Sequence, residues 1–146
     1  MFKKVYVRII HMTELVQVVG GIFINKERKM LFQLRDDKPS IPYPNYWALL
    51  GGHLECNETP LEALEREIME EIEYKIKNPM FIGTFNDGLE NLMYVFKLKI
   101  DKEVNELKLH EGQKIDYFSF EDLLLIKAPE SLKKFLVKHK EKIMSY

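Results

Sequence analysis

The chain has 146 residues, of which 46% are hydrophobic and 31% charged, and this balance is too apolar for a chain that is disordered throughout. Its 22 basic and 23 acidic residues leave a formal net charge of -1, so no overall positive field would draw it to extended nucleic acid or an acidic membrane. This length is about one domain's worth of chain, so we expect residues 1–146 to form a single domain.

The N-terminal stretch MFKKVYVRIIHMTELV has two lysines, but Arg8, His11 and Glu14 break its apolar run before it reaches the length of a signal peptide. No stretch approaches the ~20 uninterrupted apolar residues that a membrane-spanning helix needs. The lone Cys56 excludes an intramolecular disulfide and fits a reducing compartment. These features predict a cytoplasmic protein without a membrane partner.

Two β-branched and aromatic runs come first in chain order, LVQVVGGIFIN (15–25) and KMLFQLRDD (29–37), and the polar NKER separates them. This pattern predicts a β-hairpin. The segment DKPSIPYPNYW (37–47) then holds three prolines, which exclude regular structure. It predicts a surface loop that leads into the short apolar stretch WALL (47–50).

The next segment has the N-terminal capping signals of a helix that begins near Thr59. Thr59 can cap the helix, Pro60 suits the first helical position, and Glu62 completes a capping box. Four apolar residues fall within one arc at 100° per residue, so we expect this face to pack on a sheet: Leu61, Leu64, Ile68 and Ile72.

The C-terminal half begins with a second predicted hairpin, MFIGTFNDG (80–88) and NLMYVFKLKI (91–100), joined at Asp87-Gly88. KIDYFSF (114–120) predicts another strand, and EDLLL (121–125) a helical turn. ESLKKFLVKHKEKI (130–143) predicts one amphipathic helix with a shared apolar side, formed by Leu132, Phe135, Leu136 and Ile143.

Acidic residues crowd the segment 51–73, and three of them follow the helical spacing i, i+3 and i+4: Glu67, Glu70 and Glu71. Like charges at this spacing destabilise a helix by a few tenths of a kcal/mol per pair. One interpretation is a solvated glutamate face. The other is a site for a hard cation, since Mg²⁺ prefers oxygen ligands and combines carboxylates with substrate phosphates and water.

The spacing of the whole segment favours the second interpretation. Five residues separate Gly52 from Glu58, and seven separate Glu58 from the pair Arg66-Glu67. The aliphatic Ile68 follows, and after one more residue comes the pair Glu70-Glu71. This pattern resembles the Nudix box, and the flanking YWALLGGHLE and HEGQKIDYFSFEDL look like those of MutT-like Nudix hydrolases.

The resemblance implies the α/β class, a Nudix-type α/β/α sandwich with a mixed β-sheet between helices. It also implies hydrolysis of a diphosphate bond in a nucleoside diphosphate derivative, with Mg²⁺ or Mn²⁺ as cofactor. Such hydrolysis must neutralise a polyphosphate and aim a water at phosphorus, and divalent ions held by carboxylates can serve both purposes.

The resemblance also assigns roles to individual residues. The implied metal ligands are Glu67, Glu70, Glu71, the loop residue Glu111 and, through its backbone carbonyl, Gly51. The implied catalytic set is Glu67, Glu70, Arg66 and Glu111. Arg66 would orient carboxylates rather than touch substrate, and Glu58 would lie behind the ligands, bonded to Arg66 or to a metal-bound water. A lone loop glutamate such as Glu111 can also simply be solvated.

Three positions depart from the family's pattern, and none of them removes a ligand. Leu50 stands where proline is usual, and Asn57 and Glu73 stand where glycine is usual. Asn57 can keep the loop because Asn tolerates the left-handed conformation. If Glu73 adopts that conformation it costs about 1 kcal/mol; otherwise the helix runs on toward Asn78-Pro79.

Substrate contacts are predicted from residues near the proline-rich loop. Arg35 could bind a phosphate, and Tyr46 could stack on a base or sugar, whereas Trp47 is expected to pack in the core. The stretch KAPES lacks the asparagine that would favour oxidised guanine.

We therefore expect a pyrophosphohydrolase that converts a nucleoside triphosphate to a nucleoside monophosphate. The alternatives are a nucleotide-sugar or ADP-ribose type of Nudix hydrolase, and a non-catalytic nucleotide-binding Nudix domain, which would usually have lost its box glutamates. A cation-binding module without substrate would leave the glycine and arginine spacing unexplained. The implied partner is a nucleotide-type small molecule, and homodimers are frequent in the family.

Overall fold

The computed structural model describes residues 15–145, so most of the N-terminal stretch in which no export signal is predicted lies outside the described residues. Within them one sheet has seven strands: β1 (Val16–Ile24), β2 (Met30–Leu34), β3 (Trp47–Ala48), β4 (Leu50–His53), β5 (Met80–Asn86), β6 (Asn91–Lys99) and β7 (Lys114–Phe118). The helical elements are α2 (Pro60–Ile72), η1 (Val104–Glu106), α3 (Phe120–Leu123), α4 (Glu130–Lys138) and α5 (Lys140–Met144). None of the described helices is long and apolar enough to cross a membrane.

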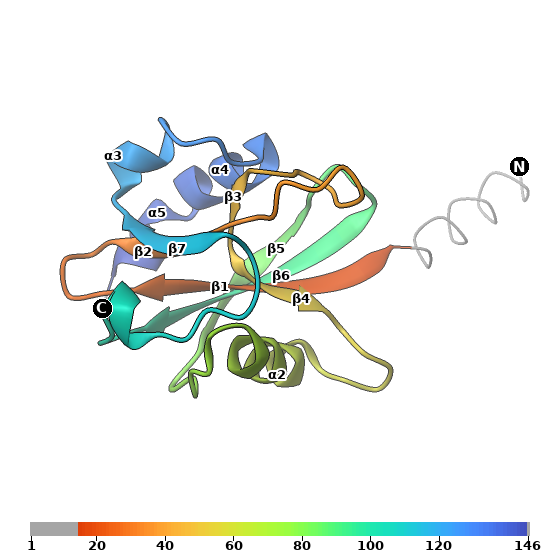
Figure 1. Cartoon of the computed structure of the whole chain (residues 1–146), viewed down its shortest axis with the longest axis horizontal. Helices are drawn as coiled ribbons and strands as arrows, with labels where there is room; N and C mark the ends of the chain where they lie inside the picture. The colour runs from red at the N-terminus through yellow and green to blue at the C-terminus, as the bar shows by residue number, and fades with distance from the viewer. Residues whose placement is uncertain (1–14, 146) are drawn as a thin grey trace, which may run out of the picture.

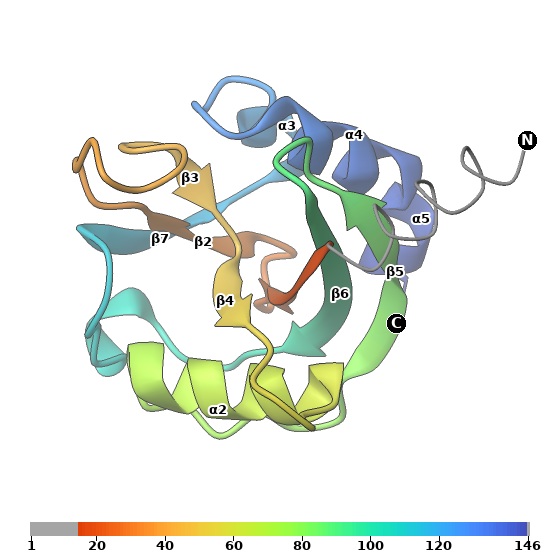
Figure 2. The same cartoon turned by 90° about the vertical axis from the view of Figure 1, so that its right-hand side faces the viewer.

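The sheet is mixed, and β1 is its centre. β1 runs parallel to β6 and antiparallel to β2 and β4, while β5 pairs with β6 and β7 with β2 in antiparallel fashion. Helix α2 lies on one face of the sheet, and α3, α4 and α5 lie on the other (Figures 1 and 2). The predicted α/β fold with a mixed sheet between helices is confirmed.

Both predicted hairpins are present. Ile24 pairs with Met30 across the first turn, and in the second the side chain of Asp87 accepts hydrogen bonds from the backbone N–H groups of Leu89 and Asn91. Residues 35–46 contain no helix or strand, as the three prolines predict. These loops leave β1 free to pair with β4 along its first half, where Gly20 lies opposite Gly51.

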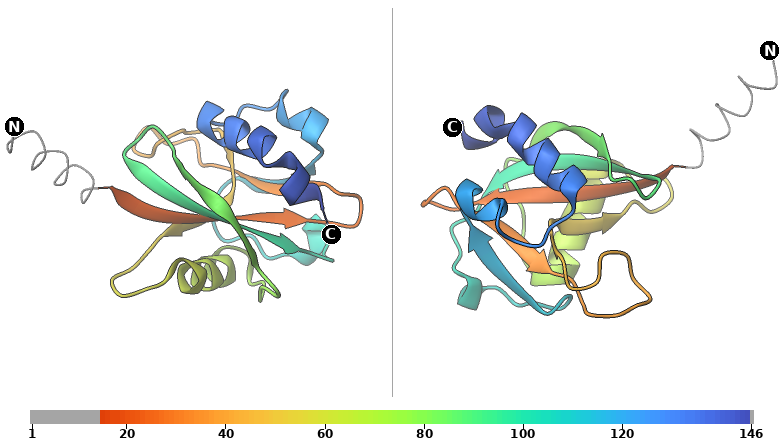
Figure 3. Two further views of the ribbon diagram at one scale, coloured as in Figure 1. Left: turned by 180° about the vertical axis from the view of Figure 1, so that it is seen from behind. Right: turned by 90° about the horizontal axis from the view of Figure 1, so that it is seen from above.

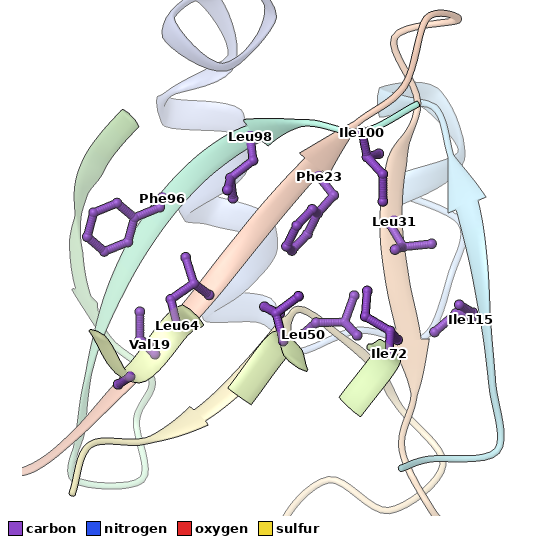
Figure 4. Packing of buried hydrophobic residues seen from close by; sticks show 12 residues of the cluster. Val19, Phe23, Leu31, Leu50, Leu64, Ile72, Phe96, Leu98, Ile100 and Ile115 are labelled. Atoms are coloured by element: carbon purple, nitrogen blue, oxygen red, sulfur yellow. The ribbon is translucent and has the colours of Figure 1, made fainter. Parts of the chain in front are cut away.

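Two hydrophobic clusters fill the two faces of the sheet. The first joins α2 to the sheet through residues such as Leu64, Ile72, Phe23 and Leu50 (Figure 4). The second lies under α4 and α5, which pack on the opposite face (Figure 3). Side chains alternate along β1, since Phe23 belongs to the first cluster and Ile22 to the second. This alternation fixes the sheet between its helices.

The predicted helix over residues 130–143 is wrong in one respect, because it breaks at His139, where the backbone has φ -104° and ψ 16°. The His139 ring lies 4.4 Å from that of Phe135, and the Lys97 ammonium donates to the Lys142 carbonyl at 2.6 Å. The last carbonyls of α5 thus lie against a lysine on β6. The expected apolar side is confirmed, since all four of its members are buried: Leu132, Phe135, Leu136 and Ile143.

Candidate functional site

Helix α2 carries most of the predicted site, and its first turn sets its position. The Thr59 side chain accepts a hydrogen bond from the Glu62 N–H at 3.2 Å, and the Glu62 carboxylate accepts one from the Thr59 N–H at 3.1 Å. This is the predicted capping box, followed by Pro60. The predicted apolar face is confirmed: Leu64, Ile68 and Ile72 are buried and Leu61 packs at the edge of the cluster. The register of the acidic residues is thereby fixed.

Three carboxylates come together beside β4. Glu67, Glu71 and Glu111 each offer one oxygen, and these oxygens lie within 4.8 Å of one another. Glu71 is only 1% exposed, whereas Glu67 is partly buried and Glu111 is exposed. Two of the acids therefore come from consecutive turns of one helix, and the third comes from the loop that precedes β7.

Two glycines on β4 make room for close contacts, Gly51 toward the β1 backbone and Gly52 toward Glu67 on α2. The Gly51 N–H faces both oxygens of the Glu71 carboxylate, at 3.3 and 3.4 Å. Gly51 has φ +147°, and a Cβ there would lie 1.9 Å from the Val19 carbonyl oxygen. A Cβ on Gly52 would lie 2.5 Å from the carboxyl carbon of Glu67. The structure thus shows the N–H of Gly51 at the site, and the role of its carbonyl as a ligand stays a prediction.

Arg66 holds the neighbouring acids in place. Its guanidinium donates two hydrogen bonds to Glu58, at 2.8 and 2.9 Å, and one to Glu67 at 2.9 Å. It also donates to the His53 carbonyl at 2.9 Å. The hydrogen bonds from Arg66 lower the pKa of Glu58 to about 2, and those carboxylates raise the pKa of Arg66. Arg66 therefore contacts the carboxylates that the resemblance has it orient, with Glu58 as its main partner, and its role in catalysis stays a prediction.

Glu70 does not join the group of three carboxylates, although the sequence led us to expect Glu67, Glu70 and Glu71 to converge. Its side chain is 59% exposed and lies 3.4 Å from Arg66, one turn away on the same helix. The i, i+4 attraction to that guanidinium accounts for the orientation. Glu111 occupies the third place instead, and metal binding by Glu70 stays a prediction.

Two of the three carboxyl groups, those of Glu71 and Glu111, have raised pKa values and so resist ionisation. Burial raises the pKa of Glu71 to about 9, the negative charges of Glu111 and Glu67 add to this, and the Gly51 N–H opposes it. Burial and the charge of Glu67 also raise the pKa of Glu111, whereas Arg35 opposes that shift. The group consists of oxygen donors that lie close together without enough positive charge around them. Such a group suits a divalent cation such as Mg²⁺ or Mn²⁺.

Sequence reasoning missed the residues that fasten the loop bearing Glu111. Gln33 on β2 is 6% exposed, and its side-chain amide donates to the Glu111 carbonyl at 2.6 Å. Gln113 donates through its backbone N–H to the Leu34 carbonyl at 2.8 Å. No local pattern could identify Gln33, because its partner is distant in sequence and its position reads as an ordinary strand residue.

The departures from the family's pattern have clear local conformations. Asn57 adopts φ +64°, as its tolerance of the left-handed region predicts. Glu73 has φ +52° and ψ +41°, and α2 ends at Ile72. Of the two outcomes left open by the sequence, the helix therefore ends at position 73 in the left-handed conformation.

The candidate substrate residues lie on and beside the proline-rich loop. Arg35 donates to the Pro42 carbonyl at 2.9 Å, and the ring of Tyr46 lies 5.2 Å from that of Tyr43, with the Lys127 ammonium 4.6 Å from it. Substrate binding by Arg35 and Tyr46 stays a prediction. Trp47 packs edge-on against Phe118 at 4.7 Å, which confirms its expected packing role.

Known proteins resemble this chain over the region that contains the site. The model of the NUDIX domain matches residues 14–138. Diphosphoinositol polyphosphate phosphohydrolase 3-alpha of Mus musculus is 31% identical over 88 residues, which are 58% of this chain and 54% of that protein. Nucleoside triphosphatase NudI of Enterobacter sp. (strain 638) is 30% identical over 94 residues, covering 58% of this chain and 65% of NudI. The chain thus spans about half to two thirds of these relatives' length.

Solved structures share the fold at lower identity. A MutT protein from Methanosarcina mazei Go1 superposes with a TM-score of 0.77 at 22% identity, covering 87% of this chain and 94% of that one. A C. elegans Ap4A hydrolase has a TM-score of 0.68 at 19% identity, covering 88% and 99%. The NUDIX domain of Shewanella oneidensis NrtR, solved with ADP ribose, has a TM-score of 0.68 at 13% identity, covering 87% and 88%.

Proposed function

The chain belongs to the Nudix hydrolase family, and from that premise we propose that it hydrolyses a phosphoanhydride bond in a nucleoside diphosphate derivative with the help of a divalent cation. The observation that carries the proposal is the meeting of Glu67, Glu71 and Glu111 within 4.8 Å at one end of α2. Such a group is unfavourable without a positive partner, and its oxygen donors are those that Mg²⁺ prefers.

The residues present fit a divalent cation, with Mg²⁺ preferred and Mn²⁺ as a substitute. Glu67, Glu71 and Glu111 would hold it, together with Glu70 and the Gly51 carbonyl if these turn toward it. When bound, the cation supplies positive charge that neutralises a polyphosphate and polarises its phosphorus–oxygen bonds. The buried Glu71 is the donor with the least freedom to move, because the Gly51 N–H and the core beneath α2 hold it.

The remaining residues of the site would then position and exchange protons. Arg66 and Glu58 form a paired brace that keeps Glu67 in one orientation. Glu70 faces solvent and contacts only Arg66 among the polar side chains around it in the described structure, at 3.4 Å. In its present orientation it is free to accept a proton from the attacking water, and in that role it would not be a ligand of the cation.

We favour a nucleoside triphosphate as substrate, cleaved to a nucleoside monophosphate and pyrophosphate. The similarity to nucleoside triphosphatase NudI supports this choice, and Arg35 and Tyr46 provide a cation and an aromatic ring for the phosphates and base. The similarity to diphosphoinositol polyphosphate phosphohydrolases supports a second candidate, a phosphoanhydride on an inositol polyphosphate.

The test is a panel of substrates assayed with Mg²⁺ and analysed for both products. It should contain deoxynucleoside triphosphates, nucleotide sugars, ADP-ribose, dinucleoside polyphosphates and a diphosphoinositol polyphosphate. We expect a nucleoside triphosphate to be the best substrate, with monophosphate and pyrophosphate released in equal amounts. Binding of nucleotides without any turnover across the panel would instead identify a non-catalytic domain.

A further inference from the structure

Glu73, which stands where the family's pattern has glycine, pairs with the residue next to Glu111. Its carboxylate lies 2.6 Å from Nε2 of His110, and the two side chains are 44% and 53% exposed. Position 73 is in the left-handed conformation and donates its backbone N–H to the Met69 carbonyl. The helix end therefore turns the Glu73 side chain away from the helix axis, toward the loop of residues 108–113, here called the Glu111 loop.

The same pair of segments is also joined through the backbone. The His110 N–H donates to the Glu71 carbonyl at 2.8 Å, so the last turn of α2 binds the loop by both a main-chain and a side-chain contact. The other side of the loop is held by Gln33 at 2.6 Å from the Glu111 carbonyl. Gly112 fits only without a side chain, since a Cβ there would lie 2.7 Å from the Gln33 side chain.

An exposed contact between two polar side chains contributes little to stability on its own. The contact between Glu73 and His110 differs because His110 is next to Glu111, and the Glu111 side chain has to reach from its loop to the acids on α2. The charge of Glu67 repels the Glu111 carboxylate, and among the described residues the loop bearing Glu111 approaches α2 through His110. A second attachment at His110 therefore opposes the repulsion that would drive Glu111 away.

We propose that Glu73 and His110 are positioning residues, which clasp the Glu111 loop to the end of α2 and so hold Glu111 against Glu67 and Glu71. Neither residue belongs to the group formed by Glu67, Glu71 and Glu111, and in this proposal both act through Glu111. The inference rests on the proposed function for the importance of Glu111. The clasp itself does not require that function, because its contacts are present in the protein alone.

The first measurement follows the clasp without metal or substrate. Hydrogen exchange of the Glu111 loop should be compared among the native protein, Glu73→Gly and His110→Ala. Glu73→Gly removes the carboxylate, and glycine suits the left-handed backbone at this position. Faster exchange in the loop therefore could not result from strain at the helix end. We expect both variants to exchange at least about twofold faster in this loop, the scale of an exposed side-chain contact, and the double variant to be no faster than either. Glu65→Gln, a charge change elsewhere on α2, is the control.

The second measurement asks whether the effect passes through Glu111. The dissociation constant for Mn²⁺, obtained from the electron paramagnetic resonance of the free ion, should rise at least about twofold in Glu73→Gly. The same change made in a Glu111→Gln background should leave the constant unaltered, since the side chain being positioned is already lost. A general structural effect of position 73 would weaken binding equally in both backgrounds.

The outcomes separate this inference from the proposed function. Unchanged exchange of the Glu111 loop in Glu73→Gly and His110→Ala would overturn the clasp. Faster exchange with an equal loss of Mn²⁺ affinity in both backgrounds would overturn positioning through Glu111. If the native protein bound no Mn²⁺, the proposed function would fail along with the positioning role, and the exchange result would still decide whether the clasp exists.

Discussion

Burial of the Glu71 carboxyl group destabilises the metal-free protein whenever that group is ionised. The side chain is 1% exposed, and two other acids lie against it while one backbone N–H offsets part of their effect. Burial raises its pKa to about 9, so in the absence of a cation the folded protein keeps this carboxyl protonated at neutral pH. A divalent cation would replace that proton, which links metal binding to pH.

This shift makes a prediction about stability and pH in the presence of chelator. The pKa of Glu71 is raised from 4.5 to about 9, so below pH 4.5 both the folded and the unfolded chain hold the proton. As the pH rises between these values, the unfolded chain loses its proton while the folded protein keeps it. The free energy of unfolding should therefore fall, by up to about 1.4 kcal/mol per pH unit from this residue.

Glu71→Gln tests the attribution, because the amide cannot ionise and has nearly the same shape. Denaturant unfolding of the two metal-free proteins should show the variant gaining stability relative to the native protein as the pH rises through this range. Glu65→Gln should follow the native protein at every pH. Parallel profiles for Glu71→Gln and the native protein would show that Glu71 is not the source of the slope.

The acids of α2 should also differ in their importance for catalysis. Glu67→Gln and Glu71→Gln should each lower kcat by about 100-fold or more with the fold intact, as expected when a preorganised electrostatic contact in an active site is removed. Glu111→Gln should have a smaller effect, because its loop is exposed. Steady-state rates at saturating Mg²⁺ measure these changes, and Glu65→Gln is again the control. A loss in Glu65→Gln equal to that in Glu71→Gln would place the metal on a different face of α2.

At the scale of the element, the end of α2 gives a prediction about the thermal stability of Glu73→Gly. Glu73 holds a left-handed backbone at φ +52°, which costs a non-glycine residue about 1 kcal/mol. Its exposed contact with His110 offsets little of this cost, because solvent screens it. Glu73→Gly should therefore leave the thermal midpoint unchanged or raise it. A clear fall in the midpoint would mean that the contact with His110 outweighs the backbone strain.

The α2 segment shows which features could be predicted from sequence. Its start at Thr59, its capping box and its buried face depend on contacts within a few residues, so local rules are sufficient. The spacing of Gly52, Arg66 and the acids carried the resemblance to the Nudix family, and that resemblance is confirmed. The mixed sheet between helices followed from the family and is confirmed as well.

Other features depend on contacts that the sequence does not display. Helical spacing alone placed Glu70 beside Glu67 and Glu71, but the attraction of Arg66 turns it to one side. The place of Glu111 depends on Gln33 and His110, which come from a strand and a loop far apart in the chain. The break at His139 does not interrupt the apolar side of residues 130–143, so the apolar periodicity could not reveal it.

At the scale of the whole molecule, the site lies where several separately stabilised parts meet. Helix α2 is fixed by the first hydrophobic cluster, β4 by its pairing with β1, and the Glu111 loop by β2 and the end of α2. Each part brings acids or glycines to the same place, so the burial of Glu71 and the charges of Glu67 and Glu111 beside it oppose the packing of all three. A cation bound there would reverse the sign of that contribution and stabilise the fold as a unit.

The last prediction is that Mg²⁺ supports both activity and stability through the same residues. Turnover should stop in excess chelator and return when Mg²⁺ is restored, because the acids cannot neutralise a polyphosphate on their own. At a Mg²⁺ concentration 100 times the dissociation constant, the folded state should gain about 2.7 kcal/mol. For a chain of this length each kcal/mol raises the thermal midpoint by roughly 2–4 °C. The gain should be much smaller in Glu67→Gln and unchanged in Glu65→Gln, and full turnover in excess chelator would contradict the proposed chemistry.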